Sequence, residues 1–484
     1  MIQGGRYHRQ GGQHFNPHIY DDIQTIAKHR HYVGNIRDHA WWGQEPDVPQ
    51  DTLAAGGGHA HCGAMIYLGD NWPAKYRNQI FMHNIHGNRM NNDLLARAGS
   101  GYVGDRAPDL MLANDKWFRG INMKYGPDGS VYLIDWYDRN ACHRTNPEIW
   151  DRTNGRVYNI SYGTPKWDHR DLRKLSDAEL VKLHGNDNEW YVRTARRILQ
   201  ERAAAGKLGK DVRQSLFDIA DNGPDVATKL RAIWTLHAID ALTDEDLLAL
   251  MNNDDEYIRS WAIQLELEDR TASPHALARL AEMAESDPSP VVRLYLASAL
   301  QRLPLDQRWP IARVLVMHAD DSDDHNLPLM YWYGIEPLVP ADTARAMDLA
   351  QEARIPLVRR FIIRRAASAA QGLEAVATLL AETGNTATQQ LILEEMLNAF
   401  QGRVNIPMPK SWTPAYERLS KSKDAAIRDQ ADQVAVVLGD QRIFPRMREQ
   451  LSNSRKDMDK RKQALEILVR GRDKHAAPAL QAAL

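Results

Sequence analysis

A helix-start signature recurs along the last two thirds of the chain and limits the folds open to this sequence. Each copy has an acidic or turn residue, a short spacer, an aliphatic residue followed by arginine, and then an apolar stripe. The pairs are Val192-Arg193, Ile258-Arg259, Val292-Arg293, Val358-Arg359 and Ile427-Arg428. Their separations of 66, 34, 66 and 69 residues are near multiples of about 33, and an internal period in this range indicates stacked helix pairs.

The residues around these helices agree with a stacked helical core. Ser176-x-x-Glu179 and Thr243-x-x-Asp246 predict capping boxes ahead of apolar runs. One helix pair cannot bury its apolar face alone, so we expect large apolar side chains here to form the core rather than bind a ligand. Examples are Trp234, Trp261, Leu296 and Leu300. The period resembles that of HEAT repeats over residues 175–484, and the resemblance implies a surface that binds a protein partner.

The first third of the chain has a different composition. Residues 1–170 hold 20 of the 30 glycines and 12 of the 18 histidines. Glycine is a poor helix residue and a good turn residue, so this part is predicted to be turn-rich and β. Pro127-Asp128-Gly129 predicts a turn ahead of a strand, with Asp128 as a turn residue. Strand patterns occur near residues 59–67, 78–89, 131–138 and 155–160.

Turn-to-strand units at this spacing are typical of a β-propeller, whose blades have four short strands. The β pattern stops near residues 162–165. The predicted fold class is therefore α+β and multidomain. Residues 1–165 are expected to form part of a β-propeller, and residues 166–484 an all-α, HEAT-like solenoid.

Several long motifs in order carry a family resemblance. Gly-Pro-Asp-Gly-Ser-Val-Tyr-Leu-Ile-Asp-Trp-Tyr-Asp over residues 126–138, with Gly-Arg-Val-Tyr-Asn-Ile over 155–160, resembles a late propeller blade of the glucose/sorbosone dehydrogenase superfamily. Residues 65–89, from Met-Ile-Tyr to His-Gly-Asn-Arg, are similar to the preceding blade. Propeller and helical repeats together resemble the membrane-bound dehydrogenases of planctomycete-type bacteria.

This resemblance implies a quinoprotein-like dehydrogenase that oxidises a sugar or an alcohol. A histidine would take the hydroxyl proton, and hydride would pass to a bound PQQ-like quinone, with Ca²⁺ as a further cofactor. Electrons would leave to an acceptor such as a cytochrome c. The resemblance also implies a periplasmic or cell-envelope location.

The chain departs from the family in two ways. Family members often carry a cytochrome c domain with a Cys-x-x-Cys-His haem motif, and Cys142-His143 lacks the first cysteine of that motif. Residues 1–165 also supply only three or four blades at roughly 40–50 residues each. We therefore expect the sequence to be the C-terminal part of a longer protein, incomplete on its own as an enzyme.

Histidines are the first candidates for chemistry. His29/His31 and His59/His61 are His-x-His pairs, and residues i and i+2 of a strand lie on one face. Imidazole suits Zn, Cu or Fe, and a neutral histidine can act as a general base. His59, His61 and His86 are therefore the catalytic candidates, with His29 and His31 as candidate metal ligands. The alternative is a set of hydrogen-bonded structural histidines.

Arg89 heads the cofactor candidates, because the resembling dehydrogenases have a similar segment near the cofactor and a guanidinium can hold a quinone carboxylate. His83 and Asn84 lie beside it in sequence. The alternative for Arg89 is a pair with Asp93 or another nearby acid. Asp135 and Asp138, in the last predicted strands, are candidate ligands for a hard cation. Their alternative role is to form hydrogen bonds from blade to blade.

Composition excludes other classes. Lys and Arg number 61 against 63 Asp and Glu, without the basic excess usual in nucleic-acid proteins. No run of 18 apolar residues and no signal-peptide h-region is visible. Cys62 and Cys142 could form one disulfide after export, or remain free or structural thiols.

Two further functions stay open beside the dehydrogenase. The first is a non-catalytic propeller and HEAT interaction protein that binds a protein or a polysaccharide, because such folds often bind without transforming. The second is a metal-dependent hydrolase or lyase, motivated by the His-x-His pairs. The substrate and the oligomeric state are not encoded in any motif of the chain.

Overall fold

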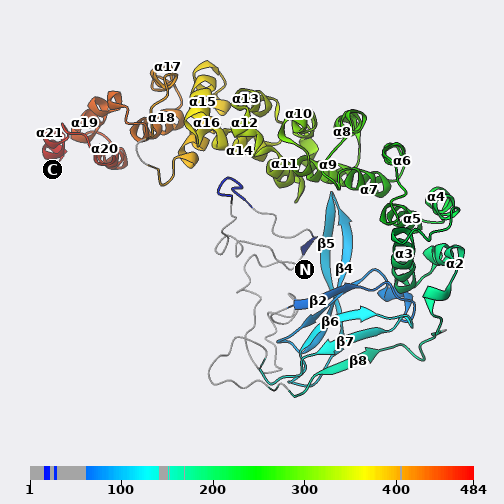
Figure 1. Cartoon of the computed structure of the whole chain (residues 1–484). Helices are drawn as coiled ribbons and strands as arrows, with labels where there is room; N and C mark the ends of the chain where they lie inside the picture. Colours follow the sequence, from blue (N-terminus) through cyan, green and yellow to red (C-terminus); the bar gives the residue numbers. More distant parts are fainter. Residues whose placement is uncertain are drawn as a thin grey trace. The chain divides into compact units, whose positions relative to one another are not determined.

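The computed structural model describes residues 16–21, 27–29, 61–140, 151, 153–167, 169–403 and 406–483. It divides into two compact units, which are described separately. The described residues of unit 1 lie within 23–268 and 289–295, and those of unit 2 lie within 12–22, 269–288 and 296–484. The described part of the chain is mixed α+β, with strands before Ile160 and helices after Asp177 (Figure 1).

Unit 1 contains two sheets. The larger has the strand order β1-β5-β4-β3-β2, and the smaller has the order β6-β7-β8. Neighbouring strands are antiparallel except for β1 and β5, which are parallel. The strands are β1 (Ala27–His29), β2 (His61–Ile66), β3 (Ile80–Asn84), β4 (Arg89–Ala98), β5 (Gly101–Leu112), β6 (Gly120–Tyr125), β7 (Val131–Asp135) and β8 (Arg156–Ile160).

The sheets share one apolar core with a buried tyrosine at its centre. The Tyr67 hydroxyl donates to the carbonyl of Gly129 at 2.8 Å and accepts the N–H of Trp72 at 2.7 Å. The predicted turn is confirmed, because Asp128 accepts hydrogen bonds from Ser130 and Gly129 has a φ of 71°. The other core side chains come from both sheets: Met65, Trp72, Phe81, Met90, Phe118, Met123, Val131 and Leu133.

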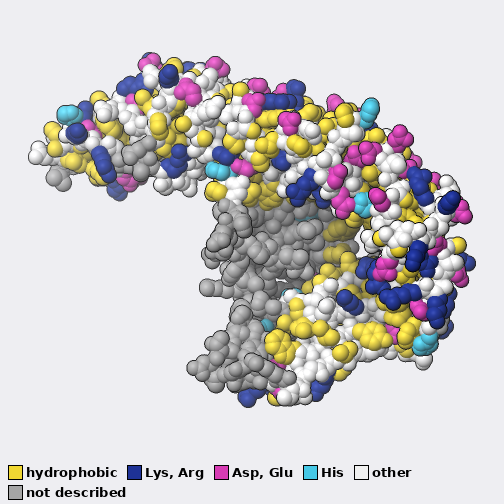
Figure 2. All heavy atoms as spheres, viewed as in Figure 1, with side chains coloured by type: hydrophobic (Ala, Val, Ile, Leu, Met, Phe, Trp, Pro, Cys, Tyr) yellow, Lys and Arg dark blue, Asp and Glu magenta, His cyan; other side chains and the backbone are white. Residues whose placement is uncertain are grey.

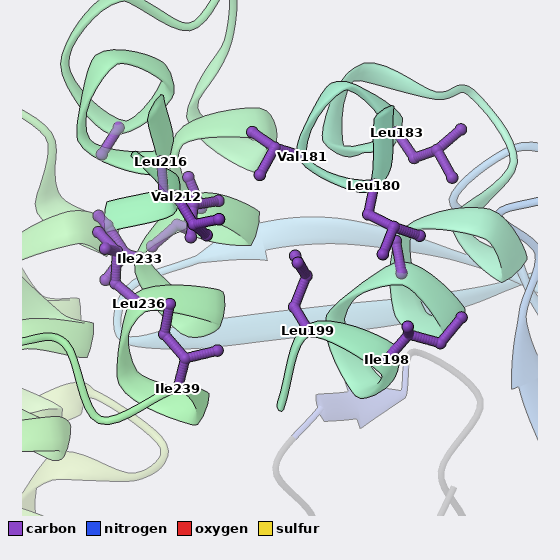
Figure 3. Close-up of a cluster of buried hydrophobic side chains, with 14 of the residues drawn as sticks. Leu180, Val181, Leu183, Ile198, Leu199, Val212, Leu216, Ile233, Leu236 and Ile239 are labelled. Carbon is purple, nitrogen blue, oxygen red and sulfur yellow. The ribbon is translucent and has the colours of Figure 1, made fainter. Parts of the chain in front are cut away.

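Six helices of unit 1 follow the sheets: α2 (Asp177–Lys182), α3 (Glu189–Ala204), α4 (Val212–Asn222), α5 (Val226–Ala238), α6 (Asp244–Leu250) and α7 (Glu256–Glu266). Both predicted capping boxes are confirmed, at the starts of α2 and α6. Leucine, isoleucine and valine side chains of α2 to α5 point toward one another in a buried cluster (Figure 3). The Asn188 amide and the Glu189 N–H tie the start of α3 to the carbonyls of Gly126 and Leu68 at 3.0 Å each. The helices of unit 1 therefore pack against the sheets through the start of α3.

Unit 2 is a run of stacked helices. Helix α14 packs against α16 and α16 against α18, while α13 packs against α15 and α15 against α17, so alternate helices form two rows. Helix α9 (Pro290–Arg302) crosses the limit between the units. The others are α8 (Pro274–Ser286), α10 (Leu305–Leu315), α11 (Leu327–Ile335), α12 (Leu338–Ala341), α13 (Thr343–Glu352), α14 (Pro356–Ala367), α15 (Ala370–Glu382), α16 (Thr386–Ala399), α17 (Trp412–Leu419), α18 (Ala425–Val437), α19 (Phe444–Ser452), α20 (Met458–Arg470) and α21 (Ala477–Ala483).

The predicted core residues of the helical region lie inside it. Leu296 and Leu300 are fully buried. Trp234 and Trp261 are partly buried against each other, with ring centroids 4.9 Å apart. No helix in the described part of the chain combines the length and the apolar character that a membrane span needs.

Candidate functional site

Three of the predicted site residues lie in one row across the larger sheet. His61 of β2 is opposite Asn84 of β3, and Asn84 is opposite Arg89 of β4. Cross-strand partners share a face of the sheet, so these side chains belong to one polar surface. His86 lies in the turn between β3 and β4 and is buried. His31, His59 and Cys142 lie outside the described residues, as does the side chain of His29.

Arg89 is held by an acid, though not by the one that the sequence suggests. Its guanidinium lies 3.0 Å from Asp109 of β5, whereas Asp93 pairs with Arg106 at 3.3 Å. Arg106 also donates to Asp109 at 2.5 Å, so two arginines and two aspartates form a balanced cluster on this face. A quinone carboxylate would have to compete with Asp109 for Arg89. Arg89 is therefore already paired with an acid in this structure.

His83 lies on the opposite face of β3, against the core. Its ring packs edge-on against Phe118, with centroids 5.9 Å apart. Burial lowers the pKa of His83 to about 4, and both ring nitrogens are buried without a hydrogen-bond partner among the described residues. A Cβ atom at Gly120 would collide with the His83 ring, which explains glycine at the start of β6. This histidine is neutral at neutral pH and has a core environment.

Asp135 and Asp138 both accept hydrogen bonds from backbone N–H groups. Asp135 accepts the N–H of Arg119 at 2.6 Å, and Asp138 accepts those of Asn140 and Asp151 at 2.8 and 2.7 Å. Burial raises the pKa of Asp135. Ca²⁺ takes six to eight oxygen ligands. Within the described ranges, no three His, Cys, Asp or Glu side chains are grouped to hold a metal ion, and Oδ2 of Asp135 is buried without a hydrogen-bond partner among them.

Cys62 of β2 lies opposite His83 of β3. Its Sγ donates to the Gly120 carbonyl at 3.4 Å, and burial raises the pKa of the thiol to about 11. A thiol in this state is a poor nucleophile near neutral pH. Its pairing with Cys142 stays a prediction, because Cys142 is not among the described residues.

Sequence reasoning missed a cleft in unit 1. Its volume is 760 Å³, and its walls are β2, β6 and the first two turns of α3. A signal for it does exist, because four lining residues of α3 follow the i, i+3, i+4, i+7 spacing of one helix face. The lining residues are Ala64, Met65, Ile66, Leu68, Asn122, Met123, Lys124, Tyr125, Trp190, Arg193, Thr194 and Arg197.

A second site, in unit 2, was also missed. The segment 16–21 contains a turn, in which the Ile19 N–H donates to the Asn16 carbonyl at 3.2 Å, and it lies against α11 and α14. The Trp332 indole N–H donates to the carbonyls of His18 and Ile19 at 3.0 and 2.9 Å. The Tyr20 ring stacks on Trp332 with centroids 5.7 Å apart, and the Arg364 guanidinium lies 4.8 Å from the centroid of the Tyr20 ring. We call the surface formed by Trp332, Tyr333, Glu336, Phe361 and Arg364 the α11–α14 face.

Polar contacts at both ends of the segment fix its register on the α11–α14 face. The Asn16 amide donates to Glu336 at 2.9 Å, and the Tyr333 hydroxyl donates to the carbonyl of Asp21 at 3.1 Å. Backbone carbonyls and one aromatic anchor are thus bound at the same surface. No local pattern in residues 16–21 predicts this contact, because its partners are more than 300 positions away in sequence.

Comparisons with known proteins give a limited result. Residues 16–164 match the sequence profile of a domain of unknown function, DUF7133. No curated protein matches the chain. One similar solved structure is the crystal structure of an engineered protein from the Northeast Structural Genomics Consortium. It is 14% identical, with a TM-score of 0.27, and the match covers 61% of this chain and 88% of that one.

Proposed function

We propose that this chain is a non-catalytic interaction protein whose helical region binds short, turn-forming segments of a protein partner. The contact between residues 16–21 and the α11–α14 face carries this proposal. Peptide recognition commonly combines hydrogen bonds to the peptide backbone with a buried aromatic anchor. Trp332 supplies such hydrogen bonds, and Tyr20 is such an anchor. The proposed partner presents a tyrosine-bearing, turn-forming segment that competes with residues 16–21.

The finer description of the fold belongs to the same proposal. The two sheets would be the last part of a β-propeller, and the two rows of helices would form a HEAT-like solenoid. The turn and strand order of residues 126–138 and 155–160 and the helix-start period support these assignments. A cell-envelope location is proposed on the family resemblance alone.

The test uses the full chain and a labelled peptide with the sequence of residues 14–23. In the wild type the tethered segment competes at the high effective concentration of an intramolecular ligand. Replacing Tyr20→Ala is expected to release it, so that the peptide binds the variant at least tenfold more tightly than the wild type. Fluorescence anisotropy measures both affinities.

Two controls make this experiment specific. Adding Tyr333→Phe to the Tyr20→Ala chain removes the hydrogen bond to Asp21, and we expect peptide affinity to fall roughly fivefold, for a loss of about 1 kcal/mol. Tyr158→Phe, a like change on the exposed strand β8, should leave the affinity unchanged. If the Tyr20→Ala chain does not bind the peptide, or if both phenylalanine changes act alike, the proposal is wrong.

The quinoprotein dehydrogenase is a second candidate, favoured by the row of His61, Asn84 and Arg89 in the larger sheet. It predicts that the full protein, incubated with PQQ and Ca²⁺, retains quinone after gel filtration and reduces a dye in the presence of a sugar or an alcohol. Arg89→Gln should abolish retention, whereas Arg97→Gln on the same strand should not. If the wild type shows neither quinone retention nor dye reduction, this candidate is eliminated.

A further inference from the structure

We propose that the cleft between β2, β6 and α3 is a binding site for a small organic anion with a flat apolar body, such as an aromatic carboxylate. This site lies within unit 1 and does not depend on the peptide contact of unit 2. Its volume of 760 Å³ is within the usual range of pockets for small ligands, roughly 300–1,000 Å³. The lining residues have already been named, and their chemistry decides the ligand class.

One side of the cleft is cationic. Arg193 and Arg197 are one helical turn apart on α3, and Lys124 comes from β6, while the described lining residues include no acid. Figure 2 shows Lys and Arg side chains gathered over the α2–α4 region. Cations at i and i+4 of a helix face the same side, so they can bind one anion together. The lining therefore selects for negative charge.

The two arginines are only loosely paired with acids of their own helix. Arg193 is 3.8 Å from Glu189, and Arg197 is 3.6 Å from Glu201. Hydrogen-bonded arginine–carboxylate pairs are shorter, at about 2.7–2.9 Å. Both arginine side chains are also 61% exposed. An anion in the cleft can therefore receive their N–H groups without breaking a tight ion pair.

The floor of the cleft is apolar and aromatic. Met65 and Met123 are almost fully buried, whereas Ile66 is 44% exposed and Trp190 is half-buried. Such an exposed apolar surface beside cations favours a ligand that has an apolar body and an acidic group. A fully polar anion such as phosphate would leave this surface uncovered.

Tyr125 supplies a further polar group. Its hydroxyl is buried and has no hydrogen-bond partner among the described residues, and the residue is part of the cleft lining. Burial raises the pKa of this phenol, so the hydroxyl keeps its proton and can donate it to an acceptor. A buried hydroxyl without a partner is costly, and a ligand oxygen would satisfy it.

The structure also explains why the cleft opens where it does. A Cβ atom at Gly63 would lie 2.7 Å from the Cα atom of Asn122, so β2 and β6 touch at this glycine. The register of β2 then shifts between Cys62 and Met65. Residues 64–66 follow this irregular section of β2 and form one wall of the cleft. The cleft is therefore a consequence of the strand geometry, with α3 as its opposite wall.

The probe for this proposal is 8-anilinonaphthalene-1-sulfonate, an aromatic sulfonate, with N-phenyl-1-naphthylamine as the same aromatic skeleton without the charge. We expect the full chain to bind the sulfonate, and Arg193→Gln/Arg197→Gln to weaken this binding about tenfold. Binding of the uncharged dye should not change. Fluorescence titration and isothermal calorimetry measure both affinities, and circular dichroism checks that the variant is folded.

Control variants complete the experiment. Arg313→Gln removes an arginine of similar exposure, 65%, from α10 and should leave sulfonate binding unchanged. Tyr125→Phe should weaken the sulfonate without lowering thermal stability. Equal sulfonate affinity in the wild type and the double variant would overturn the proposal. An equal loss of affinity for both dyes in the double variant would also overturn the proposal. So would binding of the chain to phosphatidylglycerol vesicles that depends on the two arginines and is not competed by benzoate.

Discussion

Replacing Glu395→Gln is expected to destabilise unit 2 by about 2–4 kcal/mol. Glu395 of α16 is fully buried, and its two carboxylate oxygens each accept a hydrogen bond at 2.6 Å, one from Arg360 and one from Arg364 of α14. Removing the negative charge leaves the largely buried Arg364 guanidinium with a neutral partner. Breaking a buried ion pair from one side costs more than the pair itself contributes.

The adjacent residue provides a matched control. Glu394 also pairs with Arg360, at 2.5 Å, but its side chain is 47% exposed. Exposed pairs contribute about 0–1 kcal/mol, so Glu394→Gln should have a small effect. Urea unfolding followed by circular dichroism measures both variants, and hydrogen exchange assigns the loss to α14 and α16. Equal effects of the two changes would show that burial of the carboxylate is not what stabilises this contact.

The helix starts of this protein are predictable because their causes are local. The aliphatic residues of the recurring pairs are all at most 1% exposed, and each lies in the first turn of its helix. In α7 and α18 the N-cap is an aspartate that accepts a backbone N–H of that turn. The arginine also has a local role, because Arg259 and Arg428 each donate to the carbonyl of the residue six positions earlier. Residues within one turn and its preceding loop thus specify the signature.

The contacts of the larger sheet could not be predicted in the same way. Asp93 was a candidate partner for Arg89 because it is close in sequence, yet the partner is Asp109. The register between β4 and β5 shifts between Met90 and Asn92, which places Arg106 opposite Asp93. A bulge changes which residues face each other, and alternation within one strand does not reveal it. The polar alternation at residues 89, 91 and 93 predicts a polar face, and the pairing on that face depends on the neighbouring strand.

The same distinction applies to the two binding surfaces. The spacing of Trp190, Arg193 and Arg197 indicates one face of a helix, whereas the strands that complete the cleft are known only from the fold. Likewise, no local sequence pattern predicts that the indole N–H of Trp332 binds the carbonyls of His18 and Ile19. Spacing identifies faces, and long-range packing decides what each face meets.

Acidification from pH 7 to pH 5 is expected to destabilise the helices that follow the sheets, because of His184. This side chain is fully buried, and burial lowers its pKa to about 4, with Arg196 and Arg231 adding repulsion. In the neutral ring, Nδ1–H donates to the Val181 carbonyl at 2.9 Å, and Nε2 lies 2.7 Å from Thr235 Oγ1, whose own proton is directed at the Arg231 carbonyl. Protonation would therefore cost desolvation of the charged ring and repulsion from Arg196 and Arg231.

The sign of the pH dependence follows from proton linkage. Between about pH 4 and the ordinary pKa of 6.5, the unfolded chain binds a proton at His184 and the folded chain does not, so stability falls as the pH falls. The loss between pH 7 and pH 5 is about 2 kcal/mol for one such histidine, and His83 adds a like amount in the sheets. His184→Gln should remove about 2 kcal/mol of this dependence, whereas His275→Gln, an exposed site on α8, should not. Urea unfolding at both pH values, with hydrogen exchange of α2 to α5, measures the difference. An unchanged pH dependence in His184→Gln would mean that the buried imidazole accepts its proton as readily in the folded chain as in the unfolded one.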